Sequence, residues 1–272
     1  MSSYRFPTVF LSHGTPMTAF PQEDDPYQDS LRRFAGSIPK PKAIVVVSAH
    51  SLSSDRVHIL KCERNTIQHD FAGFPPELYE MSYSCPGSPS IADEAANRFQ
   101  QAGFEVKVES EGLLDHGIWV PLLHLYPDAD VPVVRVSLPI NLLPAQILKM
   151  GHALASLREQ GVLLVGSGGA VHNLRELQWS GKHSPGAPWA VAFEEWLISS
   201  LKAKSVEAIL HFEDHPGFQR SHPSEEHFLP ILFTVGAALP GDEAEILFQG
   251  IQYGTLSMLC FGLSPGIPKT LH

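Results

Sequence analysis

Residues 42–50 read KAIVVVSAH, a run of β-branched side chains that ends in a serine, an alanine and a histidine. Consecutive Val and Ile residues without polar alternation are typical of a strand buried on both faces of a sheet. Residues 8–13, TVFLSH, form a second apolar run that also ends in a histidine. The two runs predict neighbouring strands whose terminal imidazoles, His13 and His50, meet.

Further apolar runs alternate with amphipathic segments along the chain. We expect strands at 8–11, 43–49, 131–138 and 161–166, weaker strands at 55–61 and 104–109, and helices at 89–102, 144–159 and 187–203. This alternation predicts an α/β fold with a largely parallel layered sheet flanked by helices. We interpret residues 1–272 as a single catalytic domain, with 264–272 as a loose tail.

The expected topology also predicts where a ligand binds. In open α/β sheets ligands lie beyond the carboxyl ends of the strands. His13 and His50 follow two predicted strands, and His172 follows a third through the loop GSGGAVH. Neutral imidazoles are common metal ligands. The pattern therefore predicts a metal site at this edge of the sheet, although each histidine alone is also explained as a polar strand end.

The composition narrows the class of protein. The chain has 272 residues, 43% of them hydrophobic, with a formal net charge of −10, 14 histidines and three cysteines. A negative chain without Lys/Arg clusters is not expected to bind nucleic acid or an anionic membrane. No apolar stretch approaches the roughly 20 residues that span a bilayer. Three cysteines without CxxC spacing indicate a reducing compartment, and we expect the cytoplasm.

Two central motifs each allow a structural and a functional interpretation. In LDHGIWVPL (114–122), Asp115 is expected either to cap a helix or to flank an exposed catalytic His116. His124, in the apolar helical run that follows, is interpreted as structural. Asp70, in HDFAGFPPELY (69–79), is a candidate for orienting a ligand, contacting substrate or forming a turn.

The glycine-rich loop before His172 has no nucleotide-binding signature. VGSGGAVHNL (165–174) lacks the lysine of a P-loop and the spacing of a dinucleotide fold. It also lacks the GxSxG elbow of a serine hydrolase. We interpret its glycines as allowing close backbone approach to a substrate. Arg175, directly after this motif, has two open interpretations: contact with a substrate carboxylate, or an ordinary surface position.

The segment HPSEEHFLP (222–230) carries two histidines five residues apart. This spacing does not place them on one helix face as an HExxH zinc motif would. We expect a loop followed by a helix that begins near Glu225, with Ser224 as its cap. Glu225, Glu226 and His227 are not all expected to point inward.

Taken together, six motifs resemble those of the class III extradiol ring-cleaving dioxygenases. SHGTPM, IVVVSAH, HDFAGFPPELY, LDHGIWVPL, VGSGGAVHNL and HPSEEHFLP occur in order from about residue 6 to about residue 262. The chain is most similar to the single-domain DOPA 4,5-dioxygenase-like branch, related to the catalytic subunit of protocatechuate 4,5-dioxygenase. Each motif alone is weak, but six in order are specific.

The resemblance implies roles for five histidines. His13, His50 and His227 match metal ligands, His172 matches an acid/base histidine that is also a candidate metal contact, and His116 matches a second catalytic histidine facing the substrate. The implied cofactor is non-haem Fe(II), with Zn(II) as an ion that can occupy the same site. Relatives with a carboxylate as third ligand form a 2-His-1-carboxylate triad, whereas this chain has His227 with Glu225 and Glu226 adjacent.

The implied reaction is extradiol cleavage of a catechol, L-DOPA-like or protocatechuate-like, by O2 to a muconate semialdehyde. Such chemistry needs a base near neutral pH for the catechol proton, and histidine provides one. The alternative is a zinc-bound relative that is a hydrolase or lacks ring cleavage, since three histidines and a water also suit catalytic zinc. The expected partners are a small catechol and O2, and the chain is expected to be a monomer or a homodimer.

Overall fold

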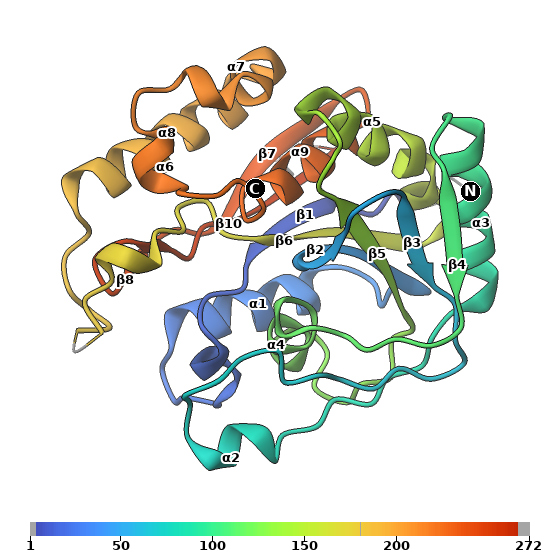
Figure 1. Ribbon diagram of the computed structural model, residues 1–272, viewed down its shortest axis with the longest axis horizontal. Coiled ribbons are helices and arrows are strands. Elements are labelled where there is room, and N and C mark those ends of the chain that lie inside the picture. The colour runs from blue at the N-terminus through green and yellow to red at the C-terminus, as the bar shows by residue number, and fades with distance from the viewer. Residues whose placement is uncertain (1–3, 180, 266–272) are drawn as a thin grey trace, which may run out of the picture.

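The KAIVVVSAH run lies in β2 (Ala43–Ser53), a central strand of the sheet. The computed structural model describes residues 4–179 and 181–265. In it β2 pairs in parallel with β5 (Val133–Pro139) on one side and with β6 (Val162–Gly168) on the other. β6 in turn pairs in parallel with β1 (Thr8–Ser12). The four strongest apolar runs of the sequence therefore form the parallel core of the sheet, as predicted (Figure 1).

Shorter strands complete the sheet at both edges. The described residues form one eight-stranded sheet in the order β4-β3-β5-β2-β6-β1-β10-β7 and one two-stranded sheet of β8 and β9. The added strands are β3 (Val57–Leu60), β4 (Val106–Glu109), β7 (Asp242–Phe248), β8 (Ile251–Gln252), β9 (Leu256–Ser257) and β10 (Cys260–Pro265). β3 is antiparallel to β5, and β10 is antiparallel to β1. The edges are thus mixed, whereas the strands that carry the histidines are parallel.

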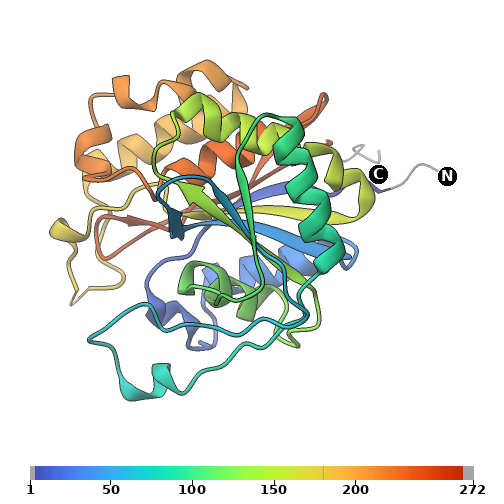
Figure 2. The same cartoon turned by 45° about the vertical axis from the view of Figure 1, so that its right-hand side comes forward.

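Helices cover both faces of the sheet (Figures 1 and 2). The α-helices are α1 (Pro26–Ser37), α2 (Pro76–Tyr79), α3 (Pro89–Gln101), α4 (His116–Leu125), α5 (Pro144–Leu154), α6 (Pro188–Lys202), α7 (Val206–Leu210), α8 (Phe218–Ser221) and α9 (Leu229–Gly236). Short 3-10 helices are η1 (Pro16–Ala19), η2 (Ala155–Gln160), η3 (Leu174–Glu176) and η4 (Phe212–Asp214). The α/β class and the helix-flanked parallel sheet are confirmed.

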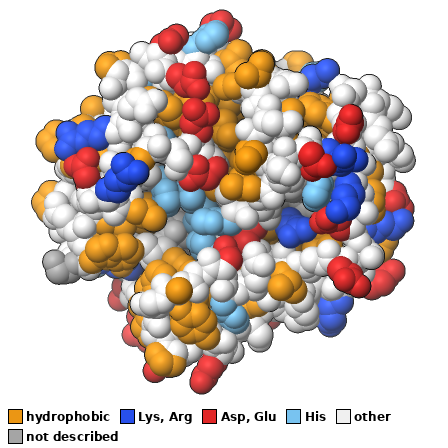
Figure 3. All heavy atoms as spheres, viewed as in Figure 1, with side chains coloured by type: hydrophobic (Ala, Val, Ile, Leu, Met, Phe, Trp, Pro, Cys, Tyr) orange, Lys and Arg blue, Asp and Glu red, His pale blue; other side chains and the backbone are white. Residues whose placement is uncertain are grey.

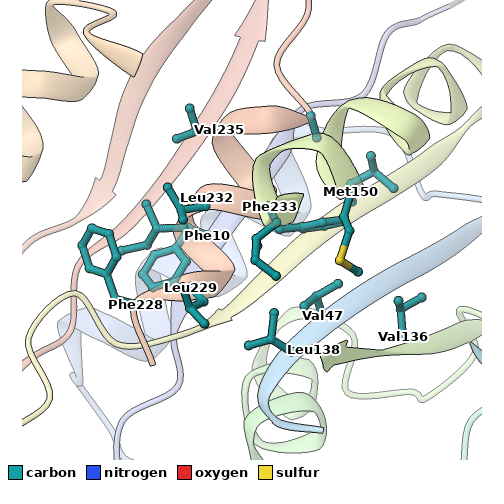
Figure 4. Packing of buried hydrophobic residues seen from close by; sticks show 14 of the residues in the cluster. Phe10, Val47, Val136, Leu138, Met150, Phe228, Leu229, Leu232, Phe233 and Val235 are labelled. Carbon is teal, nitrogen blue, oxygen red and sulfur yellow. The ribbon is translucent and has the colours of Figure 1, made fainter. Parts of the chain in front are cut away.

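Alternation along β2 divides the core into two layers. Val45 and Val47 belong to the cluster shared with α3, α5, α6 and α9, whereas Ile44 and Val46 belong to the cluster shared with α1 and α4. Successive strand residues point to opposite faces, so a continuous apolar run is required when both faces are covered. Figure 4 shows Val47 and Phe10 on the side packed by α9 and α5.

Three expectations about element ends are corrected. β2 does not stop before His50 but continues to Ser53, with a register shift against β5 between Val47 and Leu52. α9 begins at Leu229, not near Glu225. Residues 264 and 265, expected in a loose tail, belong to β10, because they pair with β7. Residues 266–272 of that tail lie outside the described residues, and the single-domain range 1–272 stays a prediction.

Within the described part of the chain, no helix combines the length and the apolarity required to cross a bilayer.

Candidate metal centre and active site

Three imidazoles converge at the carboxyl edge of the parallel strands. His13 follows β1, His50 lies in the last part of β2, and His227 precedes α9. The Nε2 atom of His50 lies 3.1 Å from Nε2 of His13 and 3.2 Å from Nε2 of His227. Three histidines that are far apart in the sequence therefore place their Nε2 atoms close together.

The hydrogen bonds of the Nδ1 atoms, which lie on the other side of each ring from Nε2, indicate where the ring protons are. The Ser167 hydroxyl donates to the Gly117 carbonyl oxygen at 2.5 Å, so its oxygen accepts from Nδ1–H of His13 at 2.9 Å. Glu226 accepts from Nδ1–H of His227 at 3.0 Å. In a neutral imidazole with a protonated Nδ1, Nε2 carries a lone pair. His13 and His227 thus both direct bare nitrogen atoms toward His50.

This arrangement fits a cation. His50 has at most one proton on Nε2, so it can donate to only one of its two neighbours, and the lone pair of the other neighbour has no proton to accept. A metal ion removes that conflict, and ligating histidines commonly donate their second N–H to a carboxylate or other acceptor. Burial, with the neighbouring imidazoles, lowers the pKa of His13 and of His227 well below the usual value. Burial first, then His116, lowers the pKa of His50 to about 4.

The ligand atoms fall into two separate sets that share no residue. Those of His13, His50 and His116 lie within 4.8 Å of one another, as do those of His172, Glu226 and His227. The 3.2 Å contact between His50 and His227 joins the sets.

A distortion of β2 positions His50. The register against β5 shifts within residues 48–51, the SAHS segment, so that β2 has extra residues here. Such bulges re-aim side chains at the rim of a sheet. The hydroxyls of Ser48 and Ser51 donate to the buried Asp115 carboxylate at 2.7 and 2.5 Å. Asp115 precedes α4 without capping it through its side chain, so the expected cap is instead an anchor for the bulge.

The glycine-rich loop brings β6 against the segment of His227. A Cβ on Gly168 would lie 2.2 Å from the His227 carbonyl oxygen, and one on Gly166 would lie 2.3 Å from that of Pro230. Gly169 N–H also donates to the His227 carbonyl at 2.9 Å. The glycines were expected to admit a substrate. They admit instead the protein's own backbone, and thereby place His227 beside His172.

His172 lies face to face with His227. The ring centroids are 3.4 Å apart and the planes differ by 7°. The loop is fixed by a hydrogen bond from the His172 N–H to the Ser221 carbonyl at 2.9 Å. Burial, with the neighbouring His222, lowers the pKa of His172 to about 3, so the ring is neutral at pH 7.

His116 is held in place by hydrogen bonds to Asp70. The Asp70 carboxylate accepts from the His116 backbone N–H and from its Nδ1–H, both at 2.9 Å. Burial alone would raise the pKa of Asp70, but its hydrogen bonds with His116 lower it. The His116 ring lies 4.1 Å from that of His50, centroid to centroid. Of the three interpretations of Asp70, the geometry supports the orientation of a candidate histidine, His116.

These histidines open onto a pocket of about 450 Å³. His50, His116, His172 and His227 line its base, whereas His13 lies beneath it and is 1% exposed. The other lining residues are Gly14, Thr15, Pro16, Phe71, Phe74, Leu174, Arg175, Trp179, Pro223, Ser224, Glu226 and Leu256. Figure 3 shows histidine side chains in a hollow near the middle of this face, with hydrophobic side chains around it. The pocket has the size and largely apolar lining of a small-molecule site.

The remaining candidates lie outside this centre. The His124 Nε2–H donates to the Thr18 carbonyl oxygen at 2.8 Å, and this histidine is structural, as expected. His222 is buried against aromatic rings and contacts the Ala170 carbonyl through Nε2. Ser224 does not cap α9 but contacts the Glu226 carboxylate at 3.0 Å. Glu225 is exposed, so the three residues 225–227 do not all point inward.

Sequence reasoning missed two residues that orient the ligand candidates. Ser167 lies in a motif that lacks the GxSxG elbow of a serine hydrolase and was given no other role, but its β6 position pairs with Leu11 of β1, two residues before His13. Glu226 was recognised as a neighbour of His227 but not as the acceptor of its Nδ1–H. Strand register would have indicated Ser167, since residues opposite a strand end are close in space.

Comparisons with known proteins agree with this architecture. Residues 7–263 match the family model described as the catalytic LigB subunit of aromatic ring-opening dioxygenase. The 4,5-DOPA dioxygenase extradiol of Escherichia coli (strain K12) is 40% identical over 262 residues, covering 95% of both chains. That of Beta vulgaris is 38% identical over 255 residues, covering 92% of this chain and 93% of the relative.

The fold also matches a solved structure. The crystal structure of an uncharacterized protein from Escherichia coli K12 aligns with a TM-score of 0.82 and 34% sequence identity, covering 96% of this chain and 100% of the other. The family match extends over nearly the whole chain, and its range includes all five candidate histidines. The chain therefore belongs to the LigB family of catalytic subunits of aromatic ring-opening dioxygenases.

Proposed function

We propose that the protein is a non-haem, metal-dependent extradiol dioxygenase that opens the ring of a catechol with O2 to give a muconate semialdehyde. The observation that carries the proposal is the convergence of three Nε2 atoms beneath an apolar pocket, two of them with their outer Nδ1–H already donated. Family membership supports the same reaction class.

His13, His50 and His227 are the proposed ligands, and Fe(II) is the proposed metal. Imidazoles suit both Fe(II) and Zn(II), so the donor set alone does not choose between them. When bound, Fe(II) would hold the catecholate and O2 together and allow electron transfer between them.

His172 is the proposed base and acid. Its ring lines the pocket, is neutral at pH 7 and lies against a ligand candidate. A neutral imidazole there accepts the proton that a catechol hydroxyl gives up on binding. The negative charge of the catecholate then stabilises the imidazolium, which returns its proton when the O–O bond is broken.

His116 is the second proposed catalytic histidine. Because Asp70 accepts its Nδ1–H, the ring presents Nε2 to the pocket side. His116 can therefore accept a proton at Nε2 and, once it is protonated there, donate a hydrogen bond to a substrate oxygen.

The aromatic wall holds the ring and limits water. Phe71 lies 5.7 Å from His116 and 5.4 Å from Phe74, centroid to centroid. Both phenylalanines belong to the loop that carries Asp70, so closure of the wall and orientation of His116 depend on one segment. Excluding water strengthens the polar interactions inside the pocket.

The test is oxygen uptake by iron-loaded protein. Protein stripped of metal is loaded anaerobically with Fe(II), mixed with L-DOPA or protocatechuate, and exposed to air. We expect oxygen consumption with a yellow semialdehyde absorbance that requires Fe(II) and is absent from zinc-loaded protein. Metal-loaded protein that gives neither signal with a panel of catechols would contradict the proposal and favour a zinc hydrolase or a protein without ring cleavage.

A cytoplasmic location and a monomer or homodimer belong to the same proposal. The described residues contain three free cysteines, Cys62, Cys85 and Cys260, which suits a reducing compartment.

A further inference from the structure

The pocket above the histidine centre has an uneven charge. Among its described lining residues Arg175 is the one Lys or Arg side chain, and Glu226 is the one carboxylate. Glu226 already accepts from His227 Nδ1–H and contacts the Ser224 hydroxyl, each at 3.0 Å. The positive charge of Arg175 is therefore not matched by the acidic group of the same pocket.

The backbone of Arg175 is fixed next to the catalytic loop. Arg175 lies in η3, which begins two residues after His172. Its N–H donates to the Asn173 side-chain oxygen at 3.0 Å, and the Asn173 amide donates to the Arg220 carbonyl at 2.7 Å. Three residues span at most about 11 Å, so the Cα atoms of His172 and Arg175 are no farther apart than that.

The guanidinium has no protein partner in the described structure. Within residues 4–179 and 181–265, no carboxylate or carbonyl accepts a hydrogen bond from the Arg175 side chain. The adjacent carboxylate, Glu176, is bound by the Arg220 guanidinium at 2.9 and 2.7 Å. Glu176 thus pairs with Arg220 and not with Arg175, so the Arg175 guanidinium is available at the pocket wall.

The surroundings of Arg175 suit an aromatic acid. Leu174 and Trp179 line the same wall and are 50% and 57% exposed. Apolar surface beside an unpaired guanidinium accommodates a short hydrocarbon spacer that ends in an anion. Arginine binds carboxylates through two parallel N–H donors, which also fixes their orientation.

We propose that Arg175 binds a carboxylate of the substrate, so that the protein selects catechols bearing a carboxylate, on the ring or on a short side chain, over neutral or cationic catechols. This inference rests on the proposed function, because it assumes that the catechol hydroxyls lie at the histidine centre. It makes Arg175 a specificity residue that acts on binding, whereas His172 and His116 act on proton transfer.

The test uses anaerobic binding, which is independent of turnover. Metal-loaded protein, with its metal content measured, is titrated calorimetrically with 3-(3,4-dihydroxyphenyl)propionate and with its methyl ester. The two probes share the catechol and differ in charge. We expect wild-type protein to bind the acid more tightly than the ester. Arg175→Gln should lower the affinity for the acid roughly ten- to a hundredfold and have little effect on the affinity for the ester. Arg175→Lys should retain part of the preference.

The matched control is Arg33→Gln, which removes an exposed arginine of α1 that does not line the pocket. It should bind both probes like wild type. Equal affinity of wild type for acid and ester, or an equal loss for both probes in Arg175→Gln, would overturn the role of Arg175. If the acid binds selectively through Arg175 but no catechol is cleaved in air, the proposed reaction fails while the carboxylate site stands.

Discussion

The two ends of the central parallel strands each bury a polar cluster, but the clusters are opposite in kind. At the amino end the fully buried Arg158 donates to the Asp242 carboxylate at 2.6 Å and to the carbonyls of Phe6, Ala237 and Leu263 at 2.7–2.9 Å. At the carboxyl end three imidazoles direct Nε2 atoms at one another with too few protons to share. The Arg158 guanidinium is paired within the protein, whereas the imidazole cluster has more acceptor nitrogens than protons, which suits a cation.

This difference separates a structural site from a functional one. Buried polar groups normally have partners because unpaired groups cost free energy. The amino-end cluster follows that rule and closes the sheet where the chain enters β1 and β6. The carboxyl-end cluster breaks the rule next to a pocket, which is where unsatisfied groups are retained for binding and catalysis. Substitutions at the two ends should therefore affect different measurements.

The largest effect is expected from His50→Ala. Removing the central Nε2 should abolish stoichiometric metal binding and lower ring-cleaving turnover by roughly a thousandfold or more, with the fold retained. Mass spectrometry measures the bound metal, oxygen uptake measures turnover, and circular dichroism shows whether the fold is retained. His152→Ala, at an exposed position of α5, is the matched control. Unchanged metal content in the His50 variant would remove it from the ligand set.

Arg158→Met should destabilise the polar cluster at the amino end of the parallel strands. It leaves the Asp242 carboxylate without its most buried partner, and we expect the free energy of unfolding to fall by about 3–5 kcal/mol. Metal per folded chain and turnover per bound metal should stay at wild-type values. Urea denaturation measures the loss. Arg32→Met, which breaks an exposed pair with Asp29, should cost less than about 1 kcal/mol. A loss of metal in folded Arg158→Met would show that the two ends are not independent.

His172→Ala should distinguish proton transfer from metal binding within the carboxyl-end cluster. The substitution removes a proposed base that stacks on His227, so turnover should fall roughly 100- to 10,000-fold while most of the metal is retained. Steady-state oxygen uptake and metal content are measured on the same sample. Full activity in this variant would exclude the acid/base role.

The smallest effect concerns pH and the buried His222. Burial lowers the pKa of His222 to about 4, whereas an unfolded histidine titrates near pH 6.5. The unfolded chain therefore binds an extra proton between these values, and stability falls as the pH falls. From pH 7 to pH 5 this group accounts for a loss of about 2 kcal/mol. His222→Phe should reduce the loss by that amount in urea titrations, and His152→Phe should not.

Much of the fold could be predicted from the sequence, because strands buried on both faces appear as continuous apolar runs. The four apolar runs became the four parallel strands, and their ends located His13, His50 and His172 correctly. The antiparallel strands β7 and β10 were not predicted. β10 contains Gly262 and ends in Ser264 and Pro265, which resemble a loop. β10 pairs with β1 and β7 pairs with β10, so both strands depend on pairing rather than on local propensity.

The site was predictable only where it follows from strand order. The β2 bulge at residues 48–51 arises from contacts of Ser48 and Ser51 with Asp115, which is distant in sequence. His227 came from the family resemblance alone, because its position depends on glycines of β6 that admit its backbone. Long-range packing of this kind leaves no periodic signal in one sequence.

The most direct test of the central claim is X-ray absorption spectroscopy of protein loaded anaerobically with one equivalent of Fe(II). We expect a single bound iron whose outer-shell scattering fits three imidazoles, and a clear loss of imidazole scattering or of iron in His227→Ala. A stoichiometric iron with no imidazole scattering, or a spectrum identical in the His227 variant, would contradict the assignment of the three converging Nε2 atoms as its ligands.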